Sequence, residues 1–227
     1  MIYQDTDLTV ADIFLLLRGL QWTMLVWSTS MVLGVALGFA LALLRHARIP
    51  VLTQVIIVFV EVFRNSPLLV QLFLLFYGLP LVSPFSPGPA EAAILTLTIN
   101  TAAFTVVNMV AALDAIPRGQ WQAANSFGLT YMQAMRYIVL PQAIRTAIPP
   151  TMNLAISQLQ TSSLISIIGV ADLTRVGTQL YVRTLKPFIV WPIIGAIYFI
   201  IAKILSLIAA RIEARLRSKV TWFEQAM

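Results

Sequence analysis

The stretch that decides the fold is LQWTMLVWSTSMVLGVALGFALALL, residues 20–44, which contains no charged side chain. An α-helix needs about 20 consecutive apolar residues to cross a bilayer, so this stretch is long enough to span a membrane. The whole chain of 227 residues has the same character, with 59% hydrophobic residues, only 11% charged residues and a mean hydropathy of +0.86. Soluble domains have about 25% charged residues. The composition therefore predicts a protein embedded in lipid and excludes a disordered chain.

Four further apolar stretches are long enough to cross the membrane. They lie at about 51–80, 91–113, 147–170 and 188–210, and the first of the four is interrupted by Glu61, Arg64 and Pro67. Proline-rich residues 80–90 are expected to form a stiff loop, because proline cannot occupy a helix interior without disrupting it. The sequence therefore predicts an all-α membrane protein with five transmembrane helices in a single domain, residues 1–227.

The distribution of Lys and Arg predicts the orientation of the chain. With the N-terminus outside, the cytoplasmic segments carry nine of the fifteen basic residues and the outer segments carry four, while Arg64 and Lys203 fall within spans. Cytoplasmic loops are enriched in Lys and Arg, so we expect the N-terminus outside and the C-terminus in the cytoplasm. The same rule accounts for the net charge of +6, and no nucleic-acid partner is expected.

One segment does not fit a simple bundle of helices. Residues 115–145, AIPRGQWQAANSFGLTYMQAMRYIVLPQAIR, are predicted to join the third and fourth spans in the cytoplasm, whereas helix connections usually have about 2–8 residues. The pattern predicts two short helices joined by an elbow. Its signals are a helical run at 118–127, a left-handed stop at Gly128, a capping box of Thr130 with Gln133, and an interruption of the second helix at Pro141.

The first of these short helices carries two small neighbouring side chains, Ala123 and Ala124, with Trp121 and Phe127 beside them. Small side chains let another surface approach closely. Periodicity alone leaves two interpretations open. The helix is either an amphipathic helix that lies on the membrane surface or a docking helix that fits a groove in a soluble partner.

The spacing in this segment resembles the EAA loop of ABC importer permeases, which reads Glu-Ala-Ala, three residues, Gly, nine residues, Ile-x-Leu-Pro. The matching residues here are Ala123-Ala124, Gly128 and Ile138-Val139-Leu140-Pro141. Gln122 stands where the family has Glu, so a predicted charged contact with a partner becomes a neutral hydrogen bond.

Two further stretches narrow the resemblance. VFRNSPLLVQL at 62–72 and LPQAIR at 140–145 are similar to the five-span permeases for polar amino acids, the group related to histidine, glutamine, arginine and glutamate importers. The resemblance covers residues from about 15 to 215. It implies the fold of a type I ABC importer permease.

The resemblance implies a transport subunit rather than an enzyme. Importers of this family combine two permease subunits, identical or sister chains, with two copies of an ATPase and an extracytoplasmic solute-binding protein, in the bacterial cytoplasmic (inner) membrane. The sequence has no G-x-x-x-x-G-K-[ST] phosphate loop, so ATP and Mg are expected on the partner ATPase, with no cofactor or metal in this chain. The resemblance assigns coupling to the ATPase to Gln122, Ala123, Ala124, Gly128, Leu140 and Pro141.

The fourth predicted span has a polar face. Asn153, Ser157, Gln160 and Thr161 are spaced i, i+4, i+7 and i+8, which places them on one side of a helix. These residues either line the substrate path, since the solute contacts of the resembled family fall on this span, or form hydrogen bonds between helices. The span contains no Asp or Glu, which favours a neutral or acidic polar amino acid as the substrate.

The second predicted span carries two charges, Glu61 and Arg64, at i, i+3 spacing. Opposite charges at this spacing can neutralise each other on one helix face, so we expect a structural ion pair. The alternative is that Arg64 binds the carboxylate of the substrate.

Two other patterns concern contacts between helices. Gly34 and Gly38 have the small-xxx-small spacing of a close-packing helix face. Asn100 and Asn108 of the third span are expected to face the interior or a second subunit.

Two other classes of function serve as alternatives. An ion-coupled secondary transporter or channel for small polar solutes is expected to show intramembrane acids and an internal repeat. A membrane enzyme needs a nucleophile with a base, or metal ligands, in its spans. Neither pattern is evident, and the lone His46, beside Arg45 in a short loop, is expected to be a surface residue.

Overall fold

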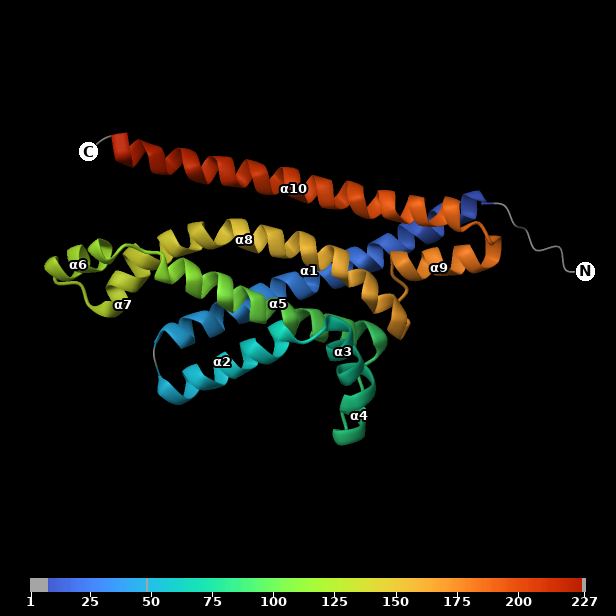
Figure 1. Ribbon diagram of the computed structural model, residues 1–227, viewed down its shortest axis with the longest axis horizontal. Helices are drawn as coiled ribbons and strands as arrows, with labels where there is room; N and C mark the ends of the chain where they lie inside the picture. Colours follow the sequence, from blue (N-terminus) through green and yellow to red (C-terminus); the bar gives the residue numbers. More distant parts are fainter. Residues whose placement is uncertain (1–7, 48, 226–227) are drawn as a thin grey trace, which may run out of the picture.

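The computed structural model describes residues 8–47 and 49–225, with side chains described as far as residue 216. All regular secondary structure in these residues is helical, as the sequence predicts (Figure 1). The α-helices are α1 (Val10–His46), α2 (Pro50–Asn65), α3 (Leu68–Phe73), α4 (Leu79–Val82), α5 (Pro89–Asp114), α6 (Arg118–Ser126), α7 (Tyr131–Ala134), α8 (Leu140–Thr161), α9 (Leu173–Thr184) and α10 (Pro187–Gln225). Two π-helical segments, η1 (Leu74–Gly78) and η2 (Met135–Val139), and a 3₁₀ helix, η3 (Ser162–Ile168), join some of them end to end.

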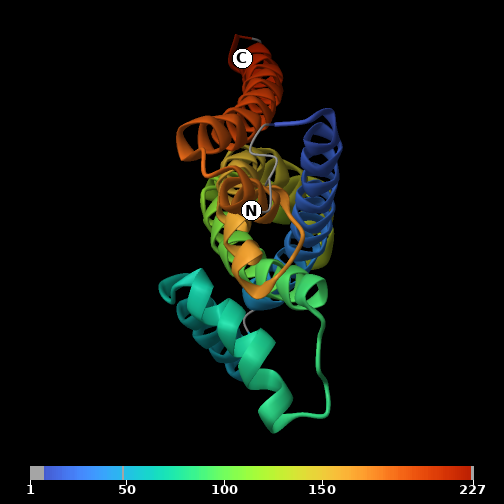
Figure 2. The ribbon, with the colours of Figure 1, turned by 90° about the vertical axis from the view of Figure 1, so that its right-hand side faces the viewer.

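The long helices α1, α5, α8 and α10 run roughly along the long axis of the molecule, with α6 and α7 at one end and α9 at the other (Figure 1). The view along this axis shows α2 to α4 on one side of the bundle and α10 on the opposite side (Figure 2). Helix α5 is central. In its most apolar stretch of 18 residues 56% of the residues are buried, whereas the corresponding share in α10 is 6%. Most of the α10 surface is therefore left for lipid or for another chain.

Helix α1 approaches α5 very closely at Gly34 and Gly38. A Cβ atom on Gly34 would lie 2.5 Å from the Cβ of Thr101. On Gly38 it would lie 2.5 Å from the Cβ of Thr105 and 2.6 Å from the carbonyl oxygen of Ala102. Carbon atoms in favourable contact are about 3.5–4.0 Å apart, so only glycine fits here. The prediction of a close-packing face at these glycines is confirmed.

Three helices, α1, α5 and α10, are each long and apolar enough to cross a membrane. Two further pairs of helices meet the same criteria of length and apolar character together, but each pair is bent. Pro50–Asn65 and Leu68–Val82 are bent by 108°, and Tyr131–Ile168 and Leu173–Thr184 by 55°. The described residues thus form three candidate spans, or up to five if each bent pair counts as one. A multi-pass helical membrane protein is confirmed, and the predicted stretch at 51–80 corresponds to the first bent pair, which is interrupted as predicted.

The break in this second span lies at Ser66 and Pro67. Proline has no backbone N–H, and its ring disfavours helical geometry in the residue before it. Ser66 is accordingly extended, with φ −104° and ψ 146°, and the helix resumes at Leu68 in a new direction. The sequence located the interruption at Pro67 but did not predict the size of the bend.

The helix that contains most of the predicted fourth span, 147–170, begins earlier in the chain. It begins at Tyr131 and continues through η2 and α8 without a break as far as Thr161. The predicted interruption of the second helix is present as a change of helix type: the π-helical segment η2 ends at Val139, and Pro141 lies in the first turn of α8 directly after it. In that segment the Leu140 N–H donates to the Met135 carbonyl, and a wider turn of this kind can accommodate a following proline.

Helix α9 was not predicted; it lies between the fourth and fifth predicted spans, in a segment that was assigned to the outer side. Its signals are present in the sequence: Asp172 is an N-cap whose carboxylate accepts hydrogen bonds from the Thr174 and Arg175 N–H groups. The apolar positions that follow have helical spacing, and the buried ones are Leu173, Val176, Gly177 and Leu180. Arg183 also forms an ion pair of 2.5 Å with buried Asp12, which fastens α9 to the start of α1.

Replacement of Gly38 tests the contact between α1 and α5. We expect Gly38→Ala to lower the free energy of unfolding by about 1–3 kcal/mol, the usual cost of overpacking, because the added methyl group meets the backbone of α5. The measurement is the Tm of the purified protein in detergent. Gly195→Ala is the control, since a Cβ there has no atom within 4 Å. An equal Tm for both variants would contradict the proposed close packing.

Candidate functional site

Helix α6 stands at one end of the molecule beside α7 (Figure 1). It spans Arg118–Ser126, which confirms the predicted helical run to within one residue. Ala124 is its buried residue, whereas Gln122 and Ala123 are exposed. The helix therefore presents a small side chain and a neutral amide outward while Ala124 packs inward.

The elbow after α6 is formed by local hydrogen bonds. The Gly128 N–H donates to the Asn125 carbonyl at 2.9 Å, and the Leu129 N–H donates to the Ala124 carbonyl at 3.1 Å. This pair of bonds is a Schellman motif, which requires a left-handed residue, and Gly128 has φ +72°. The predicted stop at Gly128 is confirmed.

The start of α7 is fixed by the predicted capping box. The Thr130 N–H donates to Oε1 of Gln133 at 2.8 Å, and the Gln133 N–H donates to Oγ1 of Thr130 at 3.4 Å. Two N–H groups at the start of the helix that lack intrahelical partners are thereby satisfied. The direction of the chain on each side of the elbow is set by residues within it.

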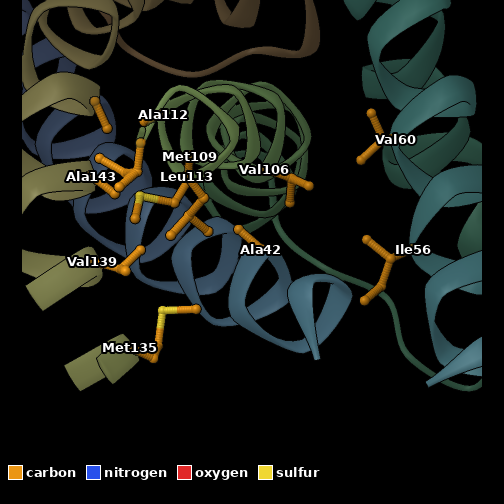
Figure 3. Close-up of a cluster of buried hydrophobic side chains, with 12 residues drawn as sticks. Ala42, Ile56, Val60, Val106, Met109, Ala112, Leu113, Met135, Val139 and Ala143 are labelled. Carbon is orange, nitrogen blue, oxygen red and sulfur yellow. The ribbon is translucent and has the colours of Figure 1, made fainter. Parts of the chain in front are cut away.

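Trp121 of α6 packs against a buried apolar cluster, whose buried members are drawn in Figure 3. The cluster joins Ala42 of α1, Leu113 of α5, Val139 of η2 and Ala143 of α8. Leu140 is half-buried against the same cluster, and Pro141 beside it is exposed.

The six residues predicted to couple to an ATPase thus fall into two groups. Gln122, Ala123, Ala124 and Gly128 lie on α6 and its stop, while Leu140 and Pro141 lie in the helix beneath it.

The predicted polar face of α8 is present and lies away from the packed core. Asn153, Ser157 and Gln160 are exposed and Thr161 is half-buried. The Oγ1 of Thr161 donates back to the Ser157 carbonyl at 2.8 Å. The four residues therefore share one side of the helix, as their spacing predicts.

The opposite side of α8 makes the interhelical hydrogen bonds. Buried Gln158 donates to Oγ of Ser30 at 3.1 Å, and Nε1 of Trp27 donates to the Ala155 carbonyl at 2.9 Å. Structural bonding between helices thus falls on Gln158 and its neighbours. The exposed polar face remains free for a solute or a second subunit.

The predicted ion pair between Glu61 and Arg64 does not form. Both side chains are exposed, and Glu61 instead accepts a hydrogen bond from Nδ2 of Asn65 at 2.6 Å. Asn65 is at i+4 from Glu61, so its short amide reaches the carboxylate without the entropy cost of ordering an arginine side chain. Arg64 is left pointing away from the packed core.

Two polar side chains, Gln71 and Asn100, stabilise the break in the second span, and we call this pair the polar clamp. Pro67 cannot donate to the Phe63 carbonyl, which would otherwise be its helical partner. Nε2 of Gln71 donates to that carbonyl at 2.7 Å, and Nδ2 of Asn100 donates to it at 3.2 Å. Asn100 also donates to Oε1 of Gln71 at 3.3 Å. Asn100 faces the interior as predicted, whereas the role of Gln71 was missed because it depends on the bend itself.

The two parts of the predicted substrate path are not brought together in one chain. Helix α2, which carries Glu61 and Arg64, packs against α5 and α1, whereas α8 packs against α5, α10 and α1. Both views place α2 and α8 on opposite sides of α5 (Figures 1 and 2). The charged residues and the polar face therefore do not form a single enclosed site within this chain.

Residues 21–218 match the protein family described as "Binding-protein-dependent transport system inner membrane component". The chain belongs to this family. It is 36% identical over 204 residues to the probable amino-acid ABC transporter permease protein PatM of Vibrio harveyi, covering 89% of this chain and 92% of that protein. It is 30% identical over 204 residues to the glutamine transport system permease protein GlnP of Escherichia coli (strain K12), covering 89% and 93%.

Solved structures agree with this assignment. A chain of the "Crystal structure of an amino acid ABC transporter with histidines" has a TM-score of 0.86 and 34% identity, covering 91% of this chain and 96% of that one. A chain of the inward-facing MetNI methionine ABC transporter has a TM-score of 0.78 at 23% identity and shows the same fold. The resemblance to ABC permeases of amino acids is confirmed, and it is favoured over a secondary transporter, a channel or a membrane enzyme.

Replacement of Gln71 tests the polar clamp. In Gln71→Met the Phe63 carbonyl loses its shorter hydrogen bond, so we expect the free energy of unfolding to fall by about 1–3 kcal/mol. The measurement is the Tm in detergent. Gln179→Met is the matched control, since Gln179 is exposed on α9. If both variants melt at the same temperature, Gln71 does not hold the bend.

Proposed function

We propose that this chain is the membrane-spanning subunit of an ATP-driven importer of polar amino acids, which a solute-binding protein delivers from outside the cell. ATP and Mg bind to separate ATPase chains, and this chain catalyses no reaction itself. The observation that carries the proposal is α6, an exposed nine-residue helix at the end of the molecule with a capped elbow behind it. A helix of this kind is suited to fit a groove in a soluble partner.

The assembly we propose contains two ATPase copies and a second permease subunit, identical or a sister chain, in the bacterial cytoplasmic membrane. Two observations support a second permease: the polar face of α8 is exposed, and a single chain does not enclose a path. The excess of Lys and Arg in the predicted cytoplasmic segments supports five spans with the N-terminus outside.

The proposed coupling depends on a rigid connection. Closure of the ATPase pair on ATP would move the groove that holds α6, with Ala123 at the contact and Gln122 as a neutral hydrogen-bonding neighbour. The Schellman stop at Gly128 and the capping box at Thr130 hold α6 at a fixed angle to α7. A displacement of α6 would then pass to η2 and α8, where Leu140 and Pro141 lie, instead of being lost in a flexible loop.

The proposed substrate path is lined by Asn153, Ser157, Gln160 and Thr161. Glu61 and Arg64 extend it from α2, and because they do not pair with each other, each is available to a charged group of the substrate. An amino acid carries both an ammonium and a carboxylate group, which one acidic and one basic residue can bind. The absence of acids among the polar residues of α8 favours a neutral or acidic side chain on the substrate.

The docking of α6 is tested by Ala123→Glu. A bulky charge on the outward face of α6 should prevent the ATPase from fitting, so we expect loss of co-purification of the ATPase and loss of ATP hydrolysis stimulated by the binding protein. The measurements are pull-down from cells that express the neighbouring operon and ATPase assays in lipid vesicles.

The control for this experiment is Ala214→Glu, which adds the same side chain at an exposed position of α10. We expect this variant to behave like the wild type. A wild-type chain that binds no ATPase would contradict the proposed function and favour an ion-coupled transporter or a channel. An Ala123→Glu variant that still couples would remove α6 as the docking element.

The role of Arg64 is tested by Arg64→Gln in uptake assays. Hydrogen bonds to charged groups contribute about 1.5–3 kcal/mol, so we expect the KM for uptake to rise about tenfold or more. Arg64→Lys keeps the charge and should show a smaller rise. Lys203→Gln removes another exposed basic residue from a predicted span and serves as the control. An unchanged KM in Arg64→Gln would exclude Arg64 from the substrate path.

A further inference from the structure

Three residues of α6 that contact the rest of the chain are Ala124, Gln120 and Trp121. Ala124 is buried beneath it. Oε1 of Gln120 accepts a hydrogen bond from Nε2 of Gln142 in α8 at 3.2 Å. Trp121 is half-buried and packs against the apolar cluster that contains Leu113 and Val139. Of these three residues, Trp121 has by far the largest side chain.

The indole ring of Trp121 contacts rings from two other elements. The ring of Tyr131, in the first turn of α7, lies parallel to it within 15°, with the centroids 5.4 Å apart. The ring of His46, in the last turn of α1, lies within 26° of it, with the centroids 6.4 Å apart. Both separations are in the range of stacked aromatic pairs, about 4.5–7 Å. These contacts join α1, α6 and α7.

This stack connects α6 to α1, two helices that are not neighbours along the backbone. Helix α6 directly follows α5 and directly precedes α7, so a displacement of α6 reaches both through the backbone. Helix α1 ends at His46, far from α6 in the sequence, and the stack links its last turn to α6. Because α1 packs on α5 through backbone contacts at Gly34 and Gly38, a force applied at His46 is carried along the bundle.

We propose that Trp121 is a positioning residue that transmits the displacement of α6 to the end of α1 through its stack with His46 and Tyr131. This inference rests on the proposed function, in which an ATPase moves α6. The docking contact, Ala123, is a separate residue that points outward from the same helix. Loss of the indole therefore leaves α6 able to dock but lets it move without the last turn of α1, which ends at His46. ATP hydrolysis then continues while transport fails.

The test uses the complete importer, with permease, ATPase and binding protein reconstituted in lipid vesicles. We expect Trp121→Ala to retain the ATPase and its basal ATP hydrolysis, while uptake per ATP falls about tenfold, within the usual range of coupling between sites. Trp121→Phe keeps a stacking ring and should recover most of the uptake. Tyr137→Ala is the control, because Tyr137 is a 66% exposed aromatic residue at the same end of the molecule.

A second measurement follows the movement directly. The chain contains no Cys, so spin labels can be placed at Gly119→Cys on α6 and at exposed Ala47→Cys after α1 without other changes. With Trp121 present, we expect ATP to leave the distance between the labels nearly unchanged, because the two elements move together. In Trp121→Leu, which keeps apolar bulk without a ring and serves if Trp121→Ala does not fold, ATP should change that distance.

Three outcomes would overturn the inference. Loss of the ATPase from Trp121→Ala would make Trp121 a docking residue. The inference would also be wrong if Trp121→Ala took up as much substrate per ATP as Tyr137→Ala, or if ATP changed the label distance equally with and without Trp121. A wild-type chain that binds no ATPase would instead overturn the proposed function on which the inference rests.

Discussion

The contact of α1 with α5 at Gly34 and Gly38 is the constraint on which the rest of the structure depends. Lipid is as apolar as a leucine side chain, so helices in a membrane gain little by burying apolar surface and depend on close van der Waals packing. Two glycines one turn apart let the backbones meet where any larger residue would separate them. Ser30 of α1, one turn before Gly34, accepts a hydrogen bond from Gln158, and this bond holds α8 against the α1–α5 pair.

Once the helices are packed, each interruption of a helix must satisfy its own backbone groups, because lipid supplies no hydrogen-bond partners. The Phe63 carbonyl, left open by Pro67, is satisfied by Gln71 and Asn100. At the start of α9, the Leu173 N–H donates to Oγ1 of Thr23 in α1 at 3.0 Å. Both breaks lie against the α1–α5 pair, so irregular backbone occurs where neighbouring helices can bond to it.

The features that the sequence predicted correctly are those whose signals lie within a few residues of each other. The stop at Gly128 and the box of Thr130 with Gln133 are local, and the face from Asn153 to Thr161 needs only helical periodicity. The failures involve competition or distance. Asn65 displaced Arg64 as the partner of Glu61, and the bend at Pro67 is stabilised by Asn100, which is distant in the sequence.

The helix that begins at the elbow also carries the polar face, and this continuity constrains how a movement of α6 can act on the proposed path. Residues from Tyr131 to Thr161 form one unbroken helical stretch, and at about 1.5 Å per residue the distance from Ala134 to Ser157 is roughly 35 Å. If this stretch were rigid, a small rotation at the elbow would become a large lateral displacement at Ser157. Pro149 and Pro150 lie between the two and remove successive backbone donors, so the helix is most easily bent there. With the side opposite the polar face anchored by Gln158 to Ser30, a bend at these prolines would move the elbow relative to a fixed polar face. The effect of a movement of α6 on the polar face of α8 thus depends on whether α1 moves with α6. Trp121 makes that connection.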